Sequence, residues 1–177
     1  MHTVGLVVLL VIVALVAIVL ALAASKPNRF AITRSILIKA PADKVFGLIN
    51  DFHVWPQWSP WEAMDPEMSR TYGAVSAGLG ATYDWSGKKA GVGRMEIIEQ
   101  TAPIQELIKL DFFKPMKANN LAEFSLAPEG DGVRLTWTMT GASNFVHKLM
   151  STLLNLDKLV GGDFEKGLAK LKALSEA

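Results

Sequence analysis

The chain has 177 residues, no cysteine and a formal net charge of +1. This length suits one domain with a packed core and one appended segment. The lack of cysteine excludes disulfides, thiol nucleophiles and thiolate zinc sites. The Lys and Arg residues are scattered, without the clustered positive charge of a nucleic-acid binder, so we predict no nucleic-acid partner.

The first 25 residues differ in composition from the rest of the chain. From Val4 to Ala24 no side chain is charged or strongly polar. A helix over this run spans roughly 30 Å, which matches the hydrocarbon core of a bilayer. The sequence therefore predicts a single-pass transmembrane helix over residues 1–25, which anchors the protein to a membrane through Val4 to Ala24.

A cleaved signal peptide is the alternative for this segment. Ala21-Leu22-Ala23 has the small-x-small form that signal peptidase accepts. Against cleavage, the apolar run exceeds the roughly 7–15 residues usual in a signal peptide, and no basic residue precedes it. Lys26 and Arg29 follow the run, so the positive-inside rule favours a cytoplasmic domain, with the periplasmic or extracellular side as the alternative. Residues 26–29 are expected to form a linker and residues 30–177 the folded domain.

The domain begins with a strand pattern and a short helix. Apolar residues alternate with polar ones from Phe30 to Lys39, which is typical of a half-buried strand. Pro41 suits the first turn of a helix whose buried side carries Val45, Phe46 and Ile49. A segment with the sequence FHVWPQWSPW follows, and its prolines prevent a long helix.

After Gly73 the pattern has a period of two almost throughout, interrupted by turn residues. Successive hairpins of this kind form an antiparallel sheet with one buried face. Large residues expected on that buried face are Tyr83, Trp85, Met95, Ile97, Ile108, Phe112, Phe124, Trp137 and Met139. Glu106 is a charged exception on the same side of its strand.

The C-terminal segment has helical periodicity. Ser143 or Asn144 is a suitable N-cap, and apolar residues then recur every three or four positions, through Leu153 to Leu171. We predict one long helix that covers the dry face of the sheet. Gly161 and Gly162 lie inside it, where each costs about 1 kcal/mol relative to alanine. This cost suggests a close backbone approach, a kink or room for a ligand.

Four segments carry a resemblance to a known family: IKAPADKVFGLINDFHVWPQWSPW, Asp65-Pro66, GVGRM at 91–95 and VGGDFEKGLAKLK at 160–172. In wording and order they resemble the SRPBCC or START-like superfamily, most closely its polyketide cyclase/dehydratase-like branch. The resemblance implies an α+β helix-grip fold, in which a curved antiparallel sheet wraps around a long C-terminal helix and leaves a cavity. Members of this superfamily bind sterols, lipids, polyketides or other apolar molecules, and only some are enzymes. The N-terminal transmembrane helix lies outside the resembling region.

The candidate site is this cavity. Trp55, Trp58 and Trp61 are expected to form a lid or wall of the pocket, or a plug at the end of the sheet. Leu153 and the large inward residues of the strands complete the predicted wall. Possible polar cavity groups are His53, Asp84 and Arg94. For Asp84 and Arg94, and also for Arg34 and Glu106, the alternative is solvent exposure or a structural ion pair.

Many inward apolar positions and few convergent titratable groups favour binding over catalysis. We expect a protein that holds a hydrophobic or amphipathic small molecule, of lipid, polyketide or isoprenoid type, without a cofactor or metal and without an assigned catalytic residue. The alternative is a cyclase or dehydratase that uses His53, Asp84 or Arg94 as acid, base or carbonyl polariser. A third possibility is a module that binds protein partners, against which the polar stripe Thr136, Thr138 and Thr140 argues.

Overall fold

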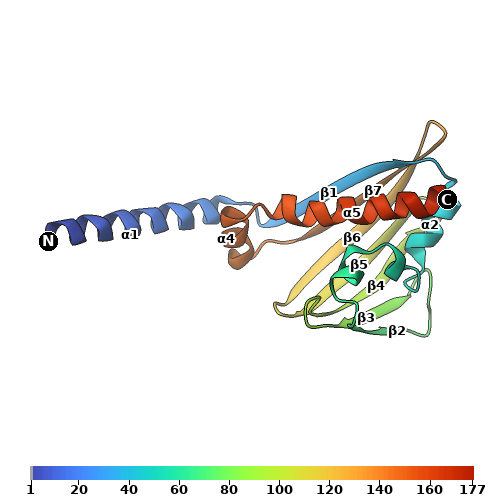
Figure 1. Cartoon of the computed structure of the whole chain (residues 1–177), viewed down its shortest axis with the longest axis horizontal. Helices are drawn as coiled ribbons and strands as arrows, with labels where there is room; N and C mark the ends of the chain where they lie inside the picture. Colours follow the sequence, from blue (N-terminus) through green and yellow to red (C-terminus); the bar gives the residue numbers. More distant parts are fainter. Residues whose placement is uncertain (1) are drawn as a thin grey trace.

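The computed structural model describes residues 2–177 (Figure 1). In chain order its elements are α1 (His2–Ser25), β1 (Arg29–Ile38), α2 (Ala42–Asn50), the 3-10 helix η1 (Trp55–Gln57), α3 (Pro60–Met64), β2 (Ser69–Tyr72), β3 (Thr82–Ser86), β4 (Val92–Thr101), β5 (Gln105–Lys114), β6 (Ala118–Glu129), β7 (Gly132–Ala142), α4 (Phe145–Leu153) and α5 (Leu156–Glu176).

The domain is an α+β helix-grip fold, as the sequence predicts. Its seven strands form one antiparallel sheet in the order β1-β7-β6-β5-β4-β3-β2. Helix α5 lies along the sheet and packs mainly on β1, while α1 extends away from the domain (Figure 1). Gly167 of α5 lies beside Trp137 of β7 and Pro60 of α3, so the helix, the sheet and the short helix α3 meet at this point.

The alternation predicted for the strands is visible in their burial. In β7 the side chains of Leu135, Trp137 and Met139 are buried, whereas Thr136 and Thr138 lie half-buried on the opposite face. The predicted stripe of α2, Val45, Phe46 and Ile49, is buried as well. The core therefore lies between the inner face of the sheet and the helices.

The predicted long C-terminal helix is present as α5, but the prediction that it runs unbroken from Ser143 or Asn144 is wrong. Helix α4 ends at Leu153, Leu154 adopts an extended backbone with φ −124° and ψ 142°, and α5 begins at Leu156. Asn155 caps the second helix, because its Oδ1 accepts a hydrogen bond from the Lys158 backbone N–H at 2.9 Å. The apolar recurrence continues across the break, so periodicity alone did not reveal it.

Arg34 explains one of the two mid-helix glycines. Its guanidinium donates hydrogen bonds to Asp157 Oδ2 at 2.9 Å and to Glu165 Oε1 at 2.8 Å, joining β1 to α5. A Cβ at Gly161 would collide with this guanidinium, whereas a Cβ at Gly162 would meet open space. Gly161 is thus a close-approach position, and Arg34 forms the expected structural ion pair.

Glu106 differs from the expectation of exposure or an ion pair. Its side chain is fully buried on the inner face of β5, and neither carboxyl oxygen has a hydrogen-bond partner among the described residues. The strand alternation that places Ile108 inside also places Glu106 inside.

Helix α1 is long and apolar enough to cross a membrane. The span Thr3–Ser25 has a mean hydropathy of 3.6, and nearly all of it is exposed. A signal sequence near the N-terminus has the same properties. Within the described chain, α1 makes its main element contact with α4 (Figure 1).

Candidate ligand-binding site

A cavity of about 190 Å³ lies between the inner face of the sheet, α3 and α5, and is partly open to the outside. It is mostly walled by apolar side chains. The wall includes the following predicted cavity residues: Trp55, Trp61, Tyr83, Trp85, Met95, Phe112, Trp137 and Met139. Val160 and Phe164 of α5 close the helix side.

Four further predicted residues face inward but do not reach the cavity. Trp58, Ile97, Ile108 and Phe124 are fully buried in the packed core. Trp58 and Trp55 donate their indole N–H groups to the carbonyls of Leu48 and Ile49 at the end of α2, each at 2.8 Å. These bonds fix the aromatic segment to the end of α2, and Trp55 and Trp61 also supply part of the cavity wall.

A polar group interrupts the apolar wall at Glu62 and Tyr83. Glu62, on α3, is only 5% exposed, and both of its oxygens are engaged. Tyr83 Oη donates to Glu62 Oε1 at 2.5 Å, and Arg70 Nε donates to Glu62 Oε2 at 2.7 Å. Arg70 thus neutralises the buried carboxylate, which is the arrangement that a charge of this kind requires.

The Tyr83 phenol is better suited to hydrogen bonding than to base catalysis. Burial raises the pKa of Tyr83, and its hydrogen bond to the Glu62 carboxylate raises it further, so the phenol stays protonated. Its proton is directed at Glu62, which leaves the phenol oxygen as an acceptor for a ligand hydroxyl.

Trp137 offers a complementary donor. Its ring lines the cavity and stacks on Phe164 with centroids 4.1 Å apart. Its Nε1 is buried, and no atom of the described residues accepts its hydrogen. An unpaired buried donor costs about 1–3 kcal/mol.

The predicted polar cavity groups lie elsewhere. His53 stacks on Tyr72, with its Nδ1 3.1 Å from Asp51 Oδ1. Asp84 and Arg94 form a cross-strand ion pair at 3.7 Å, in which Asp84 is half-buried and Arg94 is exposed. None of the three lines the cavity, because Asp84 and Arg94 occupy the outward positions of strands whose inward positions carry Tyr83, Trp85 and Met95.

Glu62 and Arg70 were not predicted as site residues from the sequence. Glu62 lies in a helix of five residues, and Arg70 lies in a strand of four. Such short elements carry no measurable periodicity, so neither face could be assigned. The available signal was Glu62 itself, a carboxylate directly after Trp61 in an otherwise apolar segment.

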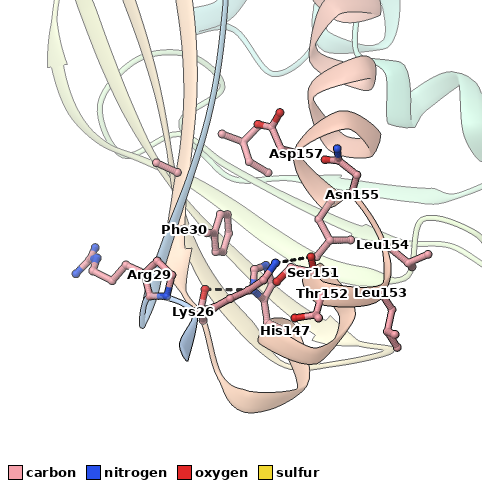
Figure 2. Close-up of a pocket in the computed structure, with 15 residues that line it drawn as sticks. Lys26, Arg29, Phe30, His147, Ser151, Thr152, Leu153, Leu154, Asn155 and Asp157 are labelled. Atoms are coloured by element: carbon pink, nitrogen blue, oxygen red, sulfur yellow. Dashed lines mark hydrogen bonds between the residues drawn. The ribbon is translucent and has the colours of Figure 1, made fainter. Parts of the chain in front are cut away.

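A second hollow, of about 580 Å³, lies between β1, α4 and the start of α5 (Figure 2). Two pairs of its polar groups contact each other: Lys26 Nζ donates to the Ser151 carbonyl at 2.5 Å, and His147 Nδ1 lies 3.1 Å from Ser143 Oγ. Leu153, predicted for the main cavity, lines this hollow instead and is 61% exposed. The break before α5 moves Leu153 off the helix that faces the sheet.

Among residues 2–177, no group of three or more His, Asp or Glu side chains is arranged to hold a metal ion. The polar cluster at Glu62 contains a single carboxylate, already paired with Arg70. The described site therefore offers hydrogen-bonding groups and apolar surface to a ligand.

Comparisons with known proteins agree with this architecture. The family described as polyketide cyclase/dehydrase and lipid transport matches residues 29–176. No curated protein matches the chain in sequence.

Solved structures share the fold at low identity. Protein CV1439 from Chromobacterium violaceum has 17% identity and a TM-score of 0.61, over 86% of this chain and 99% of that one. The Aha1 dimer from Colwellia psychrerythraea has 15% identity and a TM-score of 0.59, over 83% and 96%. The di-domain ARO/CYC BexL from the BE-7585A biosynthetic pathway has 15% identity and a TM-score of 0.60, over 89% of this chain and 53% of that one.

Proposed function

We propose a function for this chain from its family: it belongs to the polyketide cyclase/dehydrase and lipid transport family. In this proposal it is a membrane-anchored protein that binds a hydrophobic or amphipathic small molecule. The ligand is of lipid, polyketide or isoprenoid type and occupies the cavity between the sheet and α5. Its apolar body lies against the aromatic wall, and a polar atom is held near Tyr83 and Trp137.

The observation that carries this proposal is the cavity itself. A space of about 190 Å³ stays open among side chains that could have packed together. Apolar cavities of about 150 Å³ bind molecules the size of benzene, whereas sites for drug-sized ligands occupy about 300–1,000 Å³. The cavity therefore fits a ring system or part of a longer chain, and the rest of a large ligand would extend through the opening.

The anchor in this proposal is α1. Its exposed surface consists of Val, Leu, Ile and Ala side chains. Exposure of this apolar surface to water is unfavourable in free energy, whereas contact with the lipid acyl chains is favourable. Lys26 and Arg29 follow the helix, which supports a cytoplasmic placement of the domain. A ligand that partitions into the bilayer would then be available close to the domain.

The test fills the cavity and measures binding. Ala122 lines the cavity and is buried, whereas Ala127 lies on the same strand and is exposed. In the full chain in detergent, we expect Ala122→Phe to raise the Kd for 2-naphthol by about tenfold or more, equivalent to about 1.4 kcal/mol, and Ala127→Phe to leave it unchanged. Quenching of tryptophan fluorescence reports binding, because four tryptophans line the site.

Equal affinities of the two variants would show that the probe binds elsewhere and would contradict the proposal. Native mass spectrometry of the chain after exposure to a lipid extract provides a second readout, with bound mass expected in Ala127→Phe and lost in Ala122→Phe.

An enzymatic function is the second candidate, favoured by the polar group at Glu62, Tyr83 and Arg70 on the cavity wall. In that case the Tyr83 oxygen would accept a hydrogen bond from a substrate hydroxyl, because its own proton is donated to Glu62. Comparison of the parent chain with Tyr83→Phe separates the candidates. If the protein only binds its ligand, neither chain turns over a poly-β-ketone substrate, and the variant keeps most of the ligand affinity. If the protein is an enzyme, the parent chain turns the substrate over, and the variant loses this turnover while still binding the substrate.

A further inference from the structure

Helix α4 has an apolar surface that the rest of the described chain leaves uncovered. No residue of α4 is buried. Phe145, Val146 and Met150 are 51%, 50% and 39% exposed, and Leu153 and Leu154, at its end, are 61% and 48% exposed. Large apolar side chains concentrated on one short helix differ from the scattered exposed residues of an ordinary surface.

The position of α4 relative to α1 indicates what covers this surface. Helix α4 lies beside the C-terminal end of α1 and runs across its direction (Figure 1). The two segments are held together by the hydrogen bond from Lys26 Nζ to the Ser151 carbonyl (Figure 2) and by one from Lys148 Nζ to Asn28 Oδ1 at 2.6 Å. Ala23, in the last turn of α1, is fully buried.

A helix placed crosswise at the end of a membrane span lies at the level of the lipid headgroups. Its exposed apolar residues are then continuous with the lipid-facing surface of α1, and Lys26 and Lys148 stand at the same level, where ammonium groups can meet lipid phosphates. A nine-residue helix with this distribution has the features of an interfacial amphipathic helix.

We infer that α4 is a second membrane contact, which lies in the bilayer interface with Phe145, Val146, Met150 and Leu153 inserted among the lipids. This inference rests on the membrane anchoring in the proposed function. It adds that the domain is held against the bilayer in one orientation, whereas an anchor of α1 and its short linker alone would let the domain turn freely.

The chain has no cysteine, so single cysteines can carry an environment-sensitive nitrobenzoxadiazole label at chosen positions. The positions are Val11→Cys in α1, Val146→Cys and Leu153→Cys in α4, and Ala169→Cys on the exposed side of α5 near its far end. Each full-length variant is reconstituted into phosphatidylcholine and phosphatidylglycerol vesicles, with and without doxyl-labelled acyl chains. Quenching by the doxyl lipids measures contact with the hydrocarbon region.

We expect strong quenching at position 11, at least about half as much at positions 146 and 153, since interfacial helices sit at the acyl boundary, and none at 169. Quenching at 11 without quenching at 146 and 153 overturns the inference and leaves the anchor intact. No quenching at 11 overturns the anchor and this inference together.

A charge in the apolar surface provides the second test. Val146→Glu in the Leu153→Cys chain should abolish the quenching at 153, while Ala169→Glu in the same chain should leave it unchanged. Both substituted positions are exposed, so neither change disturbs the core. A label at 153 that responds to the protein-to-lipid ratio and not to doxyl lipid would identify a second copy as the occupant and would overturn the inference.

Discussion

Glu106 is a carboxyl group in an apolar core, and its protonation is coupled to folding. Burial without a partner raises its pKa to about 8. Below its ordinary value of 4.5 the group is protonated in both folded and unfolded chains. As pH rises from there to about 8, the unfolded chain ionises first, so this group progressively lowers the stability of the fold by up to about 1.4 kcal/mol per pH unit.

We therefore predict that Glu106→Gln stabilises the protein more at alkaline than at acidic pH. The difference in free energy of unfolding between variant and parent should grow by about 2–4 kcal/mol between pH 5 and pH 8. Denaturant unfolding of the full chain in detergent, followed by tryptophan fluorescence, measures it.

Glu99→Gln is the matched control for this prediction, because Glu99 is an exposed residue of the neighbouring strand β4. Both variants remove one carboxyl group, so the difference between their effects isolates the buried position. A difference for Glu106→Gln that stays constant from pH 5 to pH 8 would show that the carboxyl group is ionised and solvated in the folded protein.

The strands and helices of this fold were predictable from the sequence where the alternation of apolar and polar residues repeats over several positions. Alternation located the hairpins and assigned Tyr83, Trp85 and Trp137 to the inner face, as the buried sides of β3 and β7 confirm. The same pattern cannot give depth, because Phe124 and Phe112 both face inward but only Phe112 reaches the cavity. Whether an inward side chain lines the cavity or is packed in the core depends on how α3, α5 and the aromatic segment lie over the sheet. The sequence pattern of a single strand does not contain this information.

The break between α4 and α5 was missed for a related reason. Leu153 and Leu156 keep the helical spacing, and no Pro or Gly marks the interruption. Only Asn155 signals it, as a capping residue whose oxygen takes the Lys158 N–H. One capping residue is a weaker signal in the sequence than the leucines that keep the helical spacing on both sides of it.

The glycine pair of α5 tests whether Arg34 determines the helix-to-strand contact. Gly162→Ala meets open space, so it should raise the free energy of unfolding by about 0.5–1 kcal/mol through helix propensity. Gly161→Ala gains the same propensity but displaces the Arg34 guanidinium from Asp157 and Glu165, so its net effect should be clearly smaller or negative. Thermal unfolding in detergent compares the two variants.

The Arg34→Ala background separates the two causes. Without the guanidinium, Gly161→Ala should become as stabilising as Gly162→Ala, which gives a coupling energy between positions 34 and 161. Two glycine variants with equal effects in the parent chain would mean that Arg34 moves aside freely and that its bridge contributes nothing to the fold.

The N-terminal helix α1 has the length and composition of either a membrane anchor or a removable signal. The small-residue motif at Ala21 and Ala23 lies inside the last turns of a continuous helix, and Ala23 is fully buried. Cleavage after Ala23 would require this last turn to be accessible and extended when the peptidase acts. Retention of α1 also keeps the partner to which Lys26 and Asn28 connect α4.

We predict that this 19.2 kDa chain, expressed and isolated from membranes, keeps its uncleaved mass and stays in the pellet after alkaline carbonate extraction. Cleavage would lower the mass by about 2 kDa, the size of a segment of this length, and would release the domain. Ala21→Leu removes the small residue that a signal peptidase needs, and its position is exposed. If α1 is an anchor, this substitution leaves the mass of the isolated chain unchanged apart from the substituted side chain. If α1 is a signal peptide, the parent chain is cleaved and the variant is not, so the variant is isolated as the heavier species. The mass of the variant relative to its parent therefore distinguishes the two roles of the helix.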